Sequence, residues 1–524
     1  ALVAPAAEAE DKCNIVPPST GADLPTGPAA GSADVLVLGA GAAGVYAAKR
    51  LAEAGVDVLI LEGYKQVGGR MRTIEVAGKM VEKGAHWVQG LDGNPVWDLK
   101  NKYNLAGGTP DYEDGLTLYT SEGEAEDDDV RWGDMDDTYA RLEELGTCTL
   151  DNNEPDFNVR VGMNLAGWRT RTKIDEALVW FYHDFEYSAP PRESSLIHNY
   201  PSKTYTDFGD GDFFVTDPRG LAYMFEQELS AAGLESKVRF DCTVTKVHYT
   251  GDKVVVEVNE SGTAKHYTAD QAIMTFSIGV LEHDLVDFEP QLPAWKRKEI
   301  HKFDVAKYLK VYVAFNESVF PSDLEHTVYA DEMRGRYAYW LNMNHPKYGE
   351  DAAPYILTTH VTGFEAERLI WQSRSTTIAE IREVLSGMMG KSVPEPIDFV
   401  ICDWLTDPLF MGMYTVWPVG MTEEQLGWMR MPVGRLWFAG EAFSGKYNGY
   451  VQGALLNGNE TANKLLACRA DTSKDCVYPT AEPARESGAP SPAPSPMVDA
   501  SSSPHCFAQS LLLLVALTVG RAGL

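Results

Sequence analysis

A glycine-rich turn near the N-terminus has the residue types and spacing that bind a dinucleotide. Gly39, Gly41 and Gly44 form GxGxxG between the apolar run "DVLVLG" and a helical pattern over residues 42–54. The first glycine permits a tight turn, the second lets the backbone approach a pyrophosphate, and the third lets helix and strand pack closely. A second apolar run ends in Glu62, about 20 residues further on, where a carboxylate accepts a hydrogen bond from a ribose hydroxyl.

Two further segments suit a long phosphate-containing cofactor. Gly68, Gly69 and Arg70 form a flexible turn that carries a cation suited to a pyrophosphate. Far downstream, a predicted strand over residues 435–439 runs into a turn containing Glu441, and a predicted helix follows "YNGY". The first strand, the glycine turn, the helix, the second strand and Glu62 together indicate dinucleotide binding far more specifically than GxGxxG alone.

Lys310 and Glu186 are the side chains outside these segments that could take part in chemistry. The stretch "YLKVYVAF" alternates with a period of two, which places Lys310 on one strand face with Tyr308 and Tyr312. A lysine in that position ordinarily lies on a solvated face or extends its amine to water. Glu186 lies in "WFYHDFEY", whose aromatic residues are by themselves more typical of ordinary core.

The elements that position these residues belong to a chain long enough for two domains. The 524 residues are 44% hydrophobic and 23% charged, which is typical of a globular protein. Residues 1–32 are predicted to be a disordered lead-in, residues 471–505 a Pro/Ser-rich stalk, and residues 506–524 a hydrophobic C-terminal tail. The apolar run in the tail is shorter than a spanning helix of ~20 residues, and it fits a glycolipid-anchor signal as well as a plain hydrophobic end.

Taken in order, these motifs resemble the flavin amine oxidase family. The stretches "FGDGDFFVTDPRG", "SIGVLEHDLVDFEPQLPAWK" and "GMYTVWPVG" are similar to segments of the plant extracellular polyamine oxidases within that family. The resemblance implies an α/β (α+β) fold with a discontinuous FAD-binding, Rossmann-like domain of the glutathione-reductase type, formed by residues 33–109, 210–302 and 408–470. Residues 110–209 and 303–407 would form a substrate-binding domain of a sheet plus helices.

The resemblance also assigns roles to individual residues. Lys310 matches the lysine near flavin N5, Glu186 matches the carboxylate of the substrate tunnel, and Tyr414 and Tyr450 match an aromatic pair beside it. The implied FAD-binding residues are Gly39, Gly41, Gly44, Glu62, Gly69, Arg70, Ala85, Trp87, Val244, Trp404, Glu441 and Tyr450. Because "FSGKYNGY" lacks a cysteine where the monoamine oxidases attach their flavin, we expect non-covalent FAD. We expect no metal, because no cysteines form a CxxC pair and histidines are sparse near them.

The reaction implied by the family is oxidation of a polyamine such as spermine or spermidine. A hydride leaves the carbon beside a secondary amine for flavin N5, the imine is hydrolysed to an aldehyde and an amine, and O2 is reduced to H2O2. Gln89 departs from the pattern, because the plant relatives have an acidic residue there. The preferred polyamine and the bond that is cleaved therefore stay open, with Glu82, Asp92 and the acidic run over residues 122–129 as candidates to compensate.

Other assignments also stay open. An amine oxidase for monoamines or L-amino acids would use the same scaffold, but an amino-acid oxidase needs an arginine for the substrate carboxylate, and Glu186 would repel that group. A redox-inactive binding protein would not need Lys310 together with the cofactor motifs. The net charge of −31 argues against nucleic acid as a partner.

The cysteines and sequons favour the secretory pathway. None of the seven cysteines forms a CxxC pair, and Cys468 and Cys476 could close a small disulfide loop in an oxidising compartment. Asn259, Asn316 and Asn459 head glycosylation sequons, and the sequence begins without methionine. We expect an extracellular or cell-surface monomer, with a glycolipid anchor and an intracellular location both left open.

Overall fold

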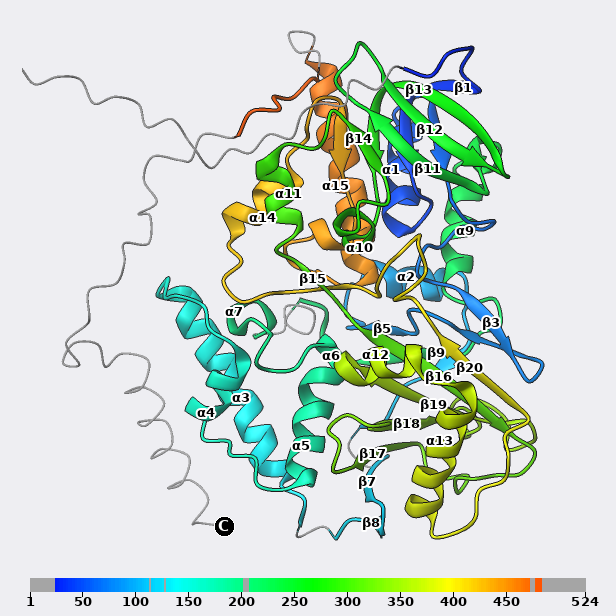
Figure 1. Cartoon of the computed structure of the whole chain (residues 1–524), viewed down its shortest axis with the longest axis vertical. Coiled ribbons are helices and arrows are strands. Elements are labelled where there is room, and N and C mark those ends of the chain that lie inside the picture. The colour runs from blue at the N-terminus through cyan, green and yellow to red at the C-terminus, as the bar shows by residue number, and fades with distance from the viewer. Residues whose placement is uncertain (1–23, 113–114, 127–128, 201–206, 472–475, 483–524) are drawn as a thin grey trace, which may run out of the picture.

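Two large sheets, one toward each end of the long axis, organise the computed structural model (Figure 1). The structure describes residues 24–112, 115–126, 129–200, 207–471 and 476–482. Several chain segments far apart in the sequence contribute to each sheet. The arrangement confirms the mixed α/β class expected from the sequence.

The first sheet has the strand order β10-β2-β1-β13-β12-β11-β14, with β22 also paired to β13. The neighbouring strands β10, β2, β1 and β13 are parallel to one another, and β22 is parallel to β13. β12 is antiparallel to both of its neighbours, β13 and β11. Its strands are β1 (Gly31–Leu38), β2 (Val58–Leu61), β10 (Val238–Arg239), β11 (Cys242–His248), β12 (Val254–Glu260), β13 (Thr263–Met274), β14 (Asp287–Glu289) and β22 (Leu436–Phe438).

Helices cover both faces of this sheet, as the buried parallel strands require. Along β1, Val35 and Val37 pack with one helical layer while Leu36 and Leu38 pack with the other. The first layer is α1 (Ala42–Glu53), α9 (Ala222–Ala231) and α15 (Val451–Ala470); the second is α10 (Ile278–Glu282), α11 (Ala294–Ile300) and α14 (Glu423–Arg430). β1 begins at Gly31, so its first two residues belong to the segment expected as lead-in.

The second sheet has the order β20-β16-β19-β18-β17-β7-β8. One face of β16 carries Leu309, Val311 and Val313 into a core shared with α12 and α13, and Tyr312 and Ala314 on the other face belong to a separate core. The strands are β7 (Leu116–Thr120), β8 (Gly123–Glu124), β16 (Tyr308–Phe315), β17 (His326–Ala330), β18 (Tyr339–Asn342), β19 (Tyr355–Thr362) and β20 (Asp398–Cys402). The accompanying helices are α12 (Gly363–Trp371), α13 (Arg374–Met389), α3 (Trp132–Asp151), α4 (Val159–Leu165) and α5 (Lys173–Val179).

Short strands join the two halves. β5 (Trp87–Gln89), β9 (Asp212–Val215) and β6 (Gly107–Gly108) form a small sheet in the order β5-β9-β6. The hairpin β3 (Thr73–Val76) and β4 (Lys79–Glu82) packs its valines against Tyr312 and Ala314 of the second sheet. This hairpin therefore contacts the substrate half, although the sequence placed it in the FAD-binding segment.

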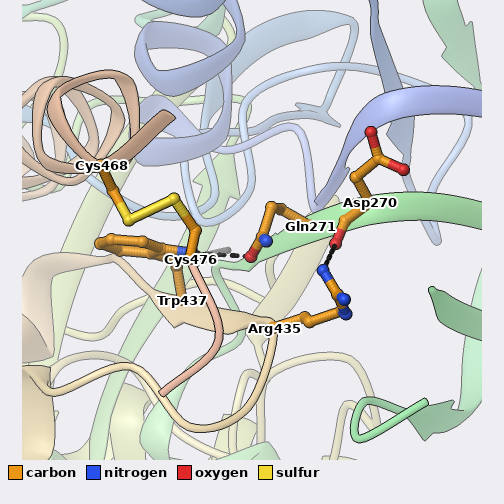
Figure 2. Close-up of a disulfide and its surroundings, with 6 residues drawn as sticks. All are labelled: Asp270, Gln271, Arg435, Trp437, Cys468 and Cys476. Carbon is orange, nitrogen blue, oxygen red and sulfur yellow. Dashed lines mark hydrogen bonds between the residues drawn. A yellow bond between two sulfur atoms is a disulfide. The ribbon is translucent and has the colours of Figure 1, made fainter. Parts of the chain in front are cut away.

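A disulfide joins Cys468, in the last turn of α15, to Cys476 and confirms the predicted pair (Figure 2). It lies beside Trp437, whose indole Nε1 donates a hydrogen bond of 3.1 Å to Gln271 Oε1. Tyr478 then pairs through its backbone with Gly434. The start of the expected stalk is thus held against the first sheet's domain, and the C-terminal tail lies outside the described residues. Among the residues described, no helix has the length and apolar character to cross a membrane.

Candidate active site

A cavity of about 800 Å³ lies between the two halves. Its wall combines the glycine turn and Glu62 of the first sheet with Lys310 of the second sheet and Glu186 of the helical region. Its volume is at the upper end of the range for small-molecule sites. The cavity thus brings the predicted cofactor residues and the predicted catalytic residues to one place.

The glycine turn is shaped for a phosphate. Gly39 has φ of +113°, a conformation that favours glycine, and a Cβ at Gly44 would lie 2.0 Å from the Gly39 carbonyl oxygen. Gly41 caps the N-terminus of α1 without a side-chain hydrogen bond, which leaves the first N–H groups for a ligand. A Cβ at Gly69 would come within 3.2 Å of Gly41 Cα. Gly44 does not line the cavity, because its role is the close approach of helix and turn.

Glu62 is fixed just beyond the end of β2. It is 6% exposed and accepts hydrogen bonds from the backbone N–H groups of Ala40 (2.6 Å) and Tyr64 (2.8 Å). Burial raises the pKa of Glu62, while these hydrogen bonds and Arg72 oppose the shift. Val244 of β11 lines the same cavity, consistent with the part of the site expected to receive the adenosine.

Glu441 holds Arg70 beside the glycines. Arg70 Nη1 donates to Glu441 Oε1 at 2.9 Å and to the Met413 carbonyl oxygen at 2.6 Å. Glu441 Oε2 accepts from the Gly449 backbone N–H at 3.1 Å and from the Thr415 hydroxyl. The "YNGY" segment and the GGR turn are therefore joined through one buried carboxylate, which leaves a cation in the cavity wall for a pyrophosphate.

Glu186 reaches the cavity through an irregular helical segment. A π-helical turn, η2 (Trp180–Asp184), leads into α6 (Phe185–Tyr187), and Ser188 ends it with φ of +56°. Such turns are frequent at functional sites because they reorient the following side chains. The Gln89 amide nitrogen lies 3.1 and 3.0 Å from the two Glu186 carboxylate oxygens.

Two tyrosines complete the surroundings of Glu186. The Tyr450 hydroxyl donates to Glu186 Oε1, and the Tyr414 hydroxyl donates to the Glu186 backbone oxygen at 2.9 Å. Burial raises the pKa of Glu186, whereas the hydrogen bonds from Tyr450 and Gln89 lower it. The sequence-predicted trio of Glu186, Tyr414 and Tyr450 thus forms one connected group.

Lys310 is 2% exposed, so its strand face is not solvated. Its Nζ donates to the Gly84 carbonyl oxygen, lies 3.1 Å from His86 Nδ1, and lies 5.5 Å from the centre of the Trp87 ring. Burial lowers the pKa of Lys310 to about 8, with Glu82 opposing the shift. An amine with this pKa can give or take a proton near neutral pH.

Trp404 is the cofactor candidate that the structure places elsewhere. Ala85, Trp87 and Tyr450 line the cavity, but Trp404 does not. Its indole Nε1 donates to the Lys83 carbonyl oxygen at 3.2 Å, and its ring packs behind Gly84. Trp404 therefore supports Gly84, whose carbonyl oxygen accepts the hydrogen bond from Lys310, and does not form part of the cavity surface.

Tyr308, His86 and Asp212 are among the cavity residues that were missed from the sequence. The Tyr308 hydroxyl lies 2.6 Å from His360 Nδ1, and its position two residues before Lys310 could have indicated that it faces the same site. His86 and Asp212 also line the cavity. Their places depend on the pairing of β5 with β9, for which the sequence carries no local signal.

A dinucleotide-binding sheet that shares its cavity with a second sheet is the arrangement of a protein that binds a dinucleotide cofactor between two domains. Residues 42–466 match the family described as flavin containing amine oxidoreductase. The chain is 34% identical over 468 residues to polyamine oxidase 1 of Zea mays, covering 85% of this chain and 92% of that protein. It is 35% identical over 447 residues to polyamine oxidase 7 of Oryza sativa subsp. japonica, covering 81% of this chain and 93% of that protein.

A solved structure of putrescine oxidase bound to putrescine is similar in fold, with a TM-score of 0.68 at 17% identity, covering 83% of this chain and 99% of that chain. By the family match and the similarity to the plant enzymes, the chain belongs to the flavin containing amine oxidoreductase family, and it is an FAD-dependent amine oxidase.

Proposed function

We propose that this protein is a polyamine oxidase that acts on spermine or spermidine. The observation that carries the proposal is Glu186, a carboxylate held by Gln89 and Tyr450 in the same aromatic cavity as Lys310. A buried anion among aromatic rings suits the ammonium groups of a polyamine, through ion pairing and cation–π contact. The substrate would be cleaved beside a secondary amine to an aldehyde and an amine, with O2 reduced to H2O2.

FAD would be held without a covalent bond by the glycine turn, Glu62, Arg70 and Val244. The open N-terminus of α1 and the side-chain-free turn fit a pyrophosphate. When bound, FAD supplies the hydride acceptor and passes the electrons to oxygen.

The remaining residues orient the substrate and manage protons. Glu186 would hold an ammonium group, and Tyr414 and Tyr450 would confine the alkyl chain and exclude water. Lys310 Nζ would keep a water or a proton in place beside the reacting centre, because it lies in the cavity wall and burial lowers the pKa of its amine.

Oxidation of an amino acid is less well supported. Arg70 is the arginine among the described residues that line the cavity, and it is already engaged by Glu441 and the Met413 carbonyl oxygen. A substrate carboxylate on the Glu186 side would meet an anion and no guanidinium.

The proposal is tested by measuring peroxide release from the purified enzyme with spermine, spermidine, putrescine, a monoamine and L-amino acids. We expect peroxide with spermine or spermidine, and mass analysis of the products identifies the bond that is cleaved. Activity confined to amino acids or monoamines would overturn the proposal.

We also propose an extracellular or cell-surface location. The Cys468–Cys476 disulfide and the exposed sequon residues Asn259 and Asn316 support it. Expression through a eukaryotic secretory pathway should yield protein that loses mass on glycosidase treatment. An unglycosylated, retained product would contradict this location.

A further inference from the structure

The pairing of β5 with β9 places a carboxylate opposite Gln89. In this antiparallel pair, Trp87 lies across from Phe214 and Gln89 across from Asp212. Because successive side chains of a strand point to opposite faces of the sheet, these two pairs lie on one face of the small sheet, and Val88 and Phe213 lie on the other. Val88 and Phe213 belong to the core under the first sheet, whereas Trp87, Gln89 and Asp212 line the cavity.

Asp212 has an oxygen without a partner. Its Oδ1 is buried and finds no hydrogen-bond partner among the described residues, while the backbone N–H of Gly90 favours its charged form. Burial, with the negative charges of Glu186 and Asp210, raises the pKa of Asp212 to about 8. A carboxylate of this kind gains from a cation that supplies the missing hydrogen bond.

Among the described residues, the other acids considered as replacements for the missing charge at Gln89 do not line the cavity. The Glu82 carboxylate accepts from the backbone N–H of Leu221 and is fully buried among protein atoms. Asp92 and the described acids of the run over residues 122–129 are absent from the cavity wall, and residues 127–128 lie outside the description. Asp212 adjoins Gln89 directly, at the distance of cross-strand neighbours.

We propose that Asp212 is a specificity-determining residue, which binds a remote ammonium group of the polyamine next to the one held by Glu186. This inference rests on the proposed polyamine oxidase function and names the second anionic contact of the same cavity. The anionic contact that the family resemblance led us to expect at the Gln89 position would thus be supplied from the neighbouring strand. Substrates with a charged end would be favoured over those whose terminal amines are acetylated.

The test compares spermine with diacetylated spermine in the FAD-containing wild type and in Asp212→Asn. We expect about a tenfold higher KM for spermine in the variant, with kcat within twofold. For diacetylated spermine, KM, or the inhibition constant if it is not turned over, should stay within twofold. Asp92→Asn, at an exposed carboxylate just beyond β5, makes the same charge change outside the cavity and should leave both substrates unaffected.

An unchanged spermine KM, or an equal loss with both substrates, would overturn the proposal. A second variant, Gln89→Glu/Asp212→Asn, moves the carboxylate from β9 to the facing position on β5. Its KM for spermine should return to within threefold of the wild-type value. A KM that stays high in a flavin-loaded double variant would also contradict the proposal. If wild-type flavin is not reduced by any polyamine, the proposed function itself fails, which is a separate outcome.

Discussion

Lys310 Nζ lies 3.1 Å from His86 Nδ1, at the floor of the cavity shared by the two sheets. Burial lowers the pKa of His86 well below its usual value, so the imidazole is neutral and can accept a hydrogen bond from the lysine. The Gly84 carbonyl oxygen accepts a second one. A lysine tied down in this way is a fixed proton-bearing group rather than a mobile surface cation.

Replacing Lys310 should slow the flavin reactions without unfolding the protein. We expect Lys310→Met to retain FAD and to lose at least tenfold in the rate of flavin reduction or reoxidation, about 1.4 kcal/mol of barrier. Stopped-flow measurement of each half-reaction is the readout. Lys307→Met is the matched control, because Lys307 is exposed and pairs with Glu367. Unchanged rates in both half-reactions would show that Lys310 has a structural role only.

Removing the charge of Glu186 should weaken substrate binding. We expect Glu186→Gln to raise the KM for spermine by at least tenfold, since a hydrogen bond to a charged group is worth about 1.5–3 kcal/mol. Gln89 and Tyr450 can still hydrogen-bond to the amide, so the fold and the FAD content should persist. A KM equal to that of the wild type would remove Glu186 from the binding site.

Polyamine affinity should increase with pH around the pKa of Asp212. Because that pKa is raised to about 8, the carboxylate is mostly protonated at pH 7 and mostly ionised at pH 8.5. The charged groups that face it are Glu186 and Asp210, and its charge in turn raises the pKa of the Tyr339 hydroxyl. The apparent Kd for spermine, measured from the flavin spectrum in the absence of turnover, should therefore fall several-fold over this interval. Asp212→Asn should abolish that change, and an equally steep profile in the variant would contradict the assignment.

Glu228 should stabilise the cofactor half above pH 4.5. Its carboxylate joins Lys49 of α1 to Lys102 and Tyr103 at the end of α2 (Pro95–Lys102). Burial would raise the pKa of Glu228, but hydrogen bonds from these three residues outweigh it and lower the pKa to about 2. The stabilisation is thus present above the unfolded pKa of about 4.5 and is lost as pH falls toward 2.

Denaturant unfolding at several pH values checks this effect. We expect Glu228→Gln to cost about 2 kcal/mol at pH 7 and progressively less below pH 4.5. Glu226→Gln, on the same helix, is the control. A destabilisation by Glu228→Gln that does not diminish in acid would mean that packing, not charge, accounts for it.

The sequence predicted the parts of the site that depend on local pattern. The glycine turn and Glu62 follow from local spacing and close approach, and Gly39, Gly41 and Glu62 lie in the cavity wall. Periodicity placed Lys310 on one strand face with Tyr308, and the family resemblance placed that face at the cofactor; both side chains line the cavity. The Cys468–Cys476 disulfide was also predicted, because the two cysteines are near neighbours in the chain.

Features that depend on long-range pairing could not be predicted. Asp212 reaches the cavity only because β9 pairs with β5 in one particular register, and a shift of one residue would turn it toward the core. Trp404 was placed against the cofactor by resemblance, but it packs behind Gly84. The π-helical turn before Glu186 likewise has no local sequence signature.

The proposed polyamine oxidase activity is tested most directly by adding spermine and spermidine to the oxidised enzyme without oxygen and following the flavin absorbance. Full bleaching by one or both, with no bleaching by L-amino acids, is the predicted result. A flavin that stays oxidised with every polyamine tested would contradict the proposed function.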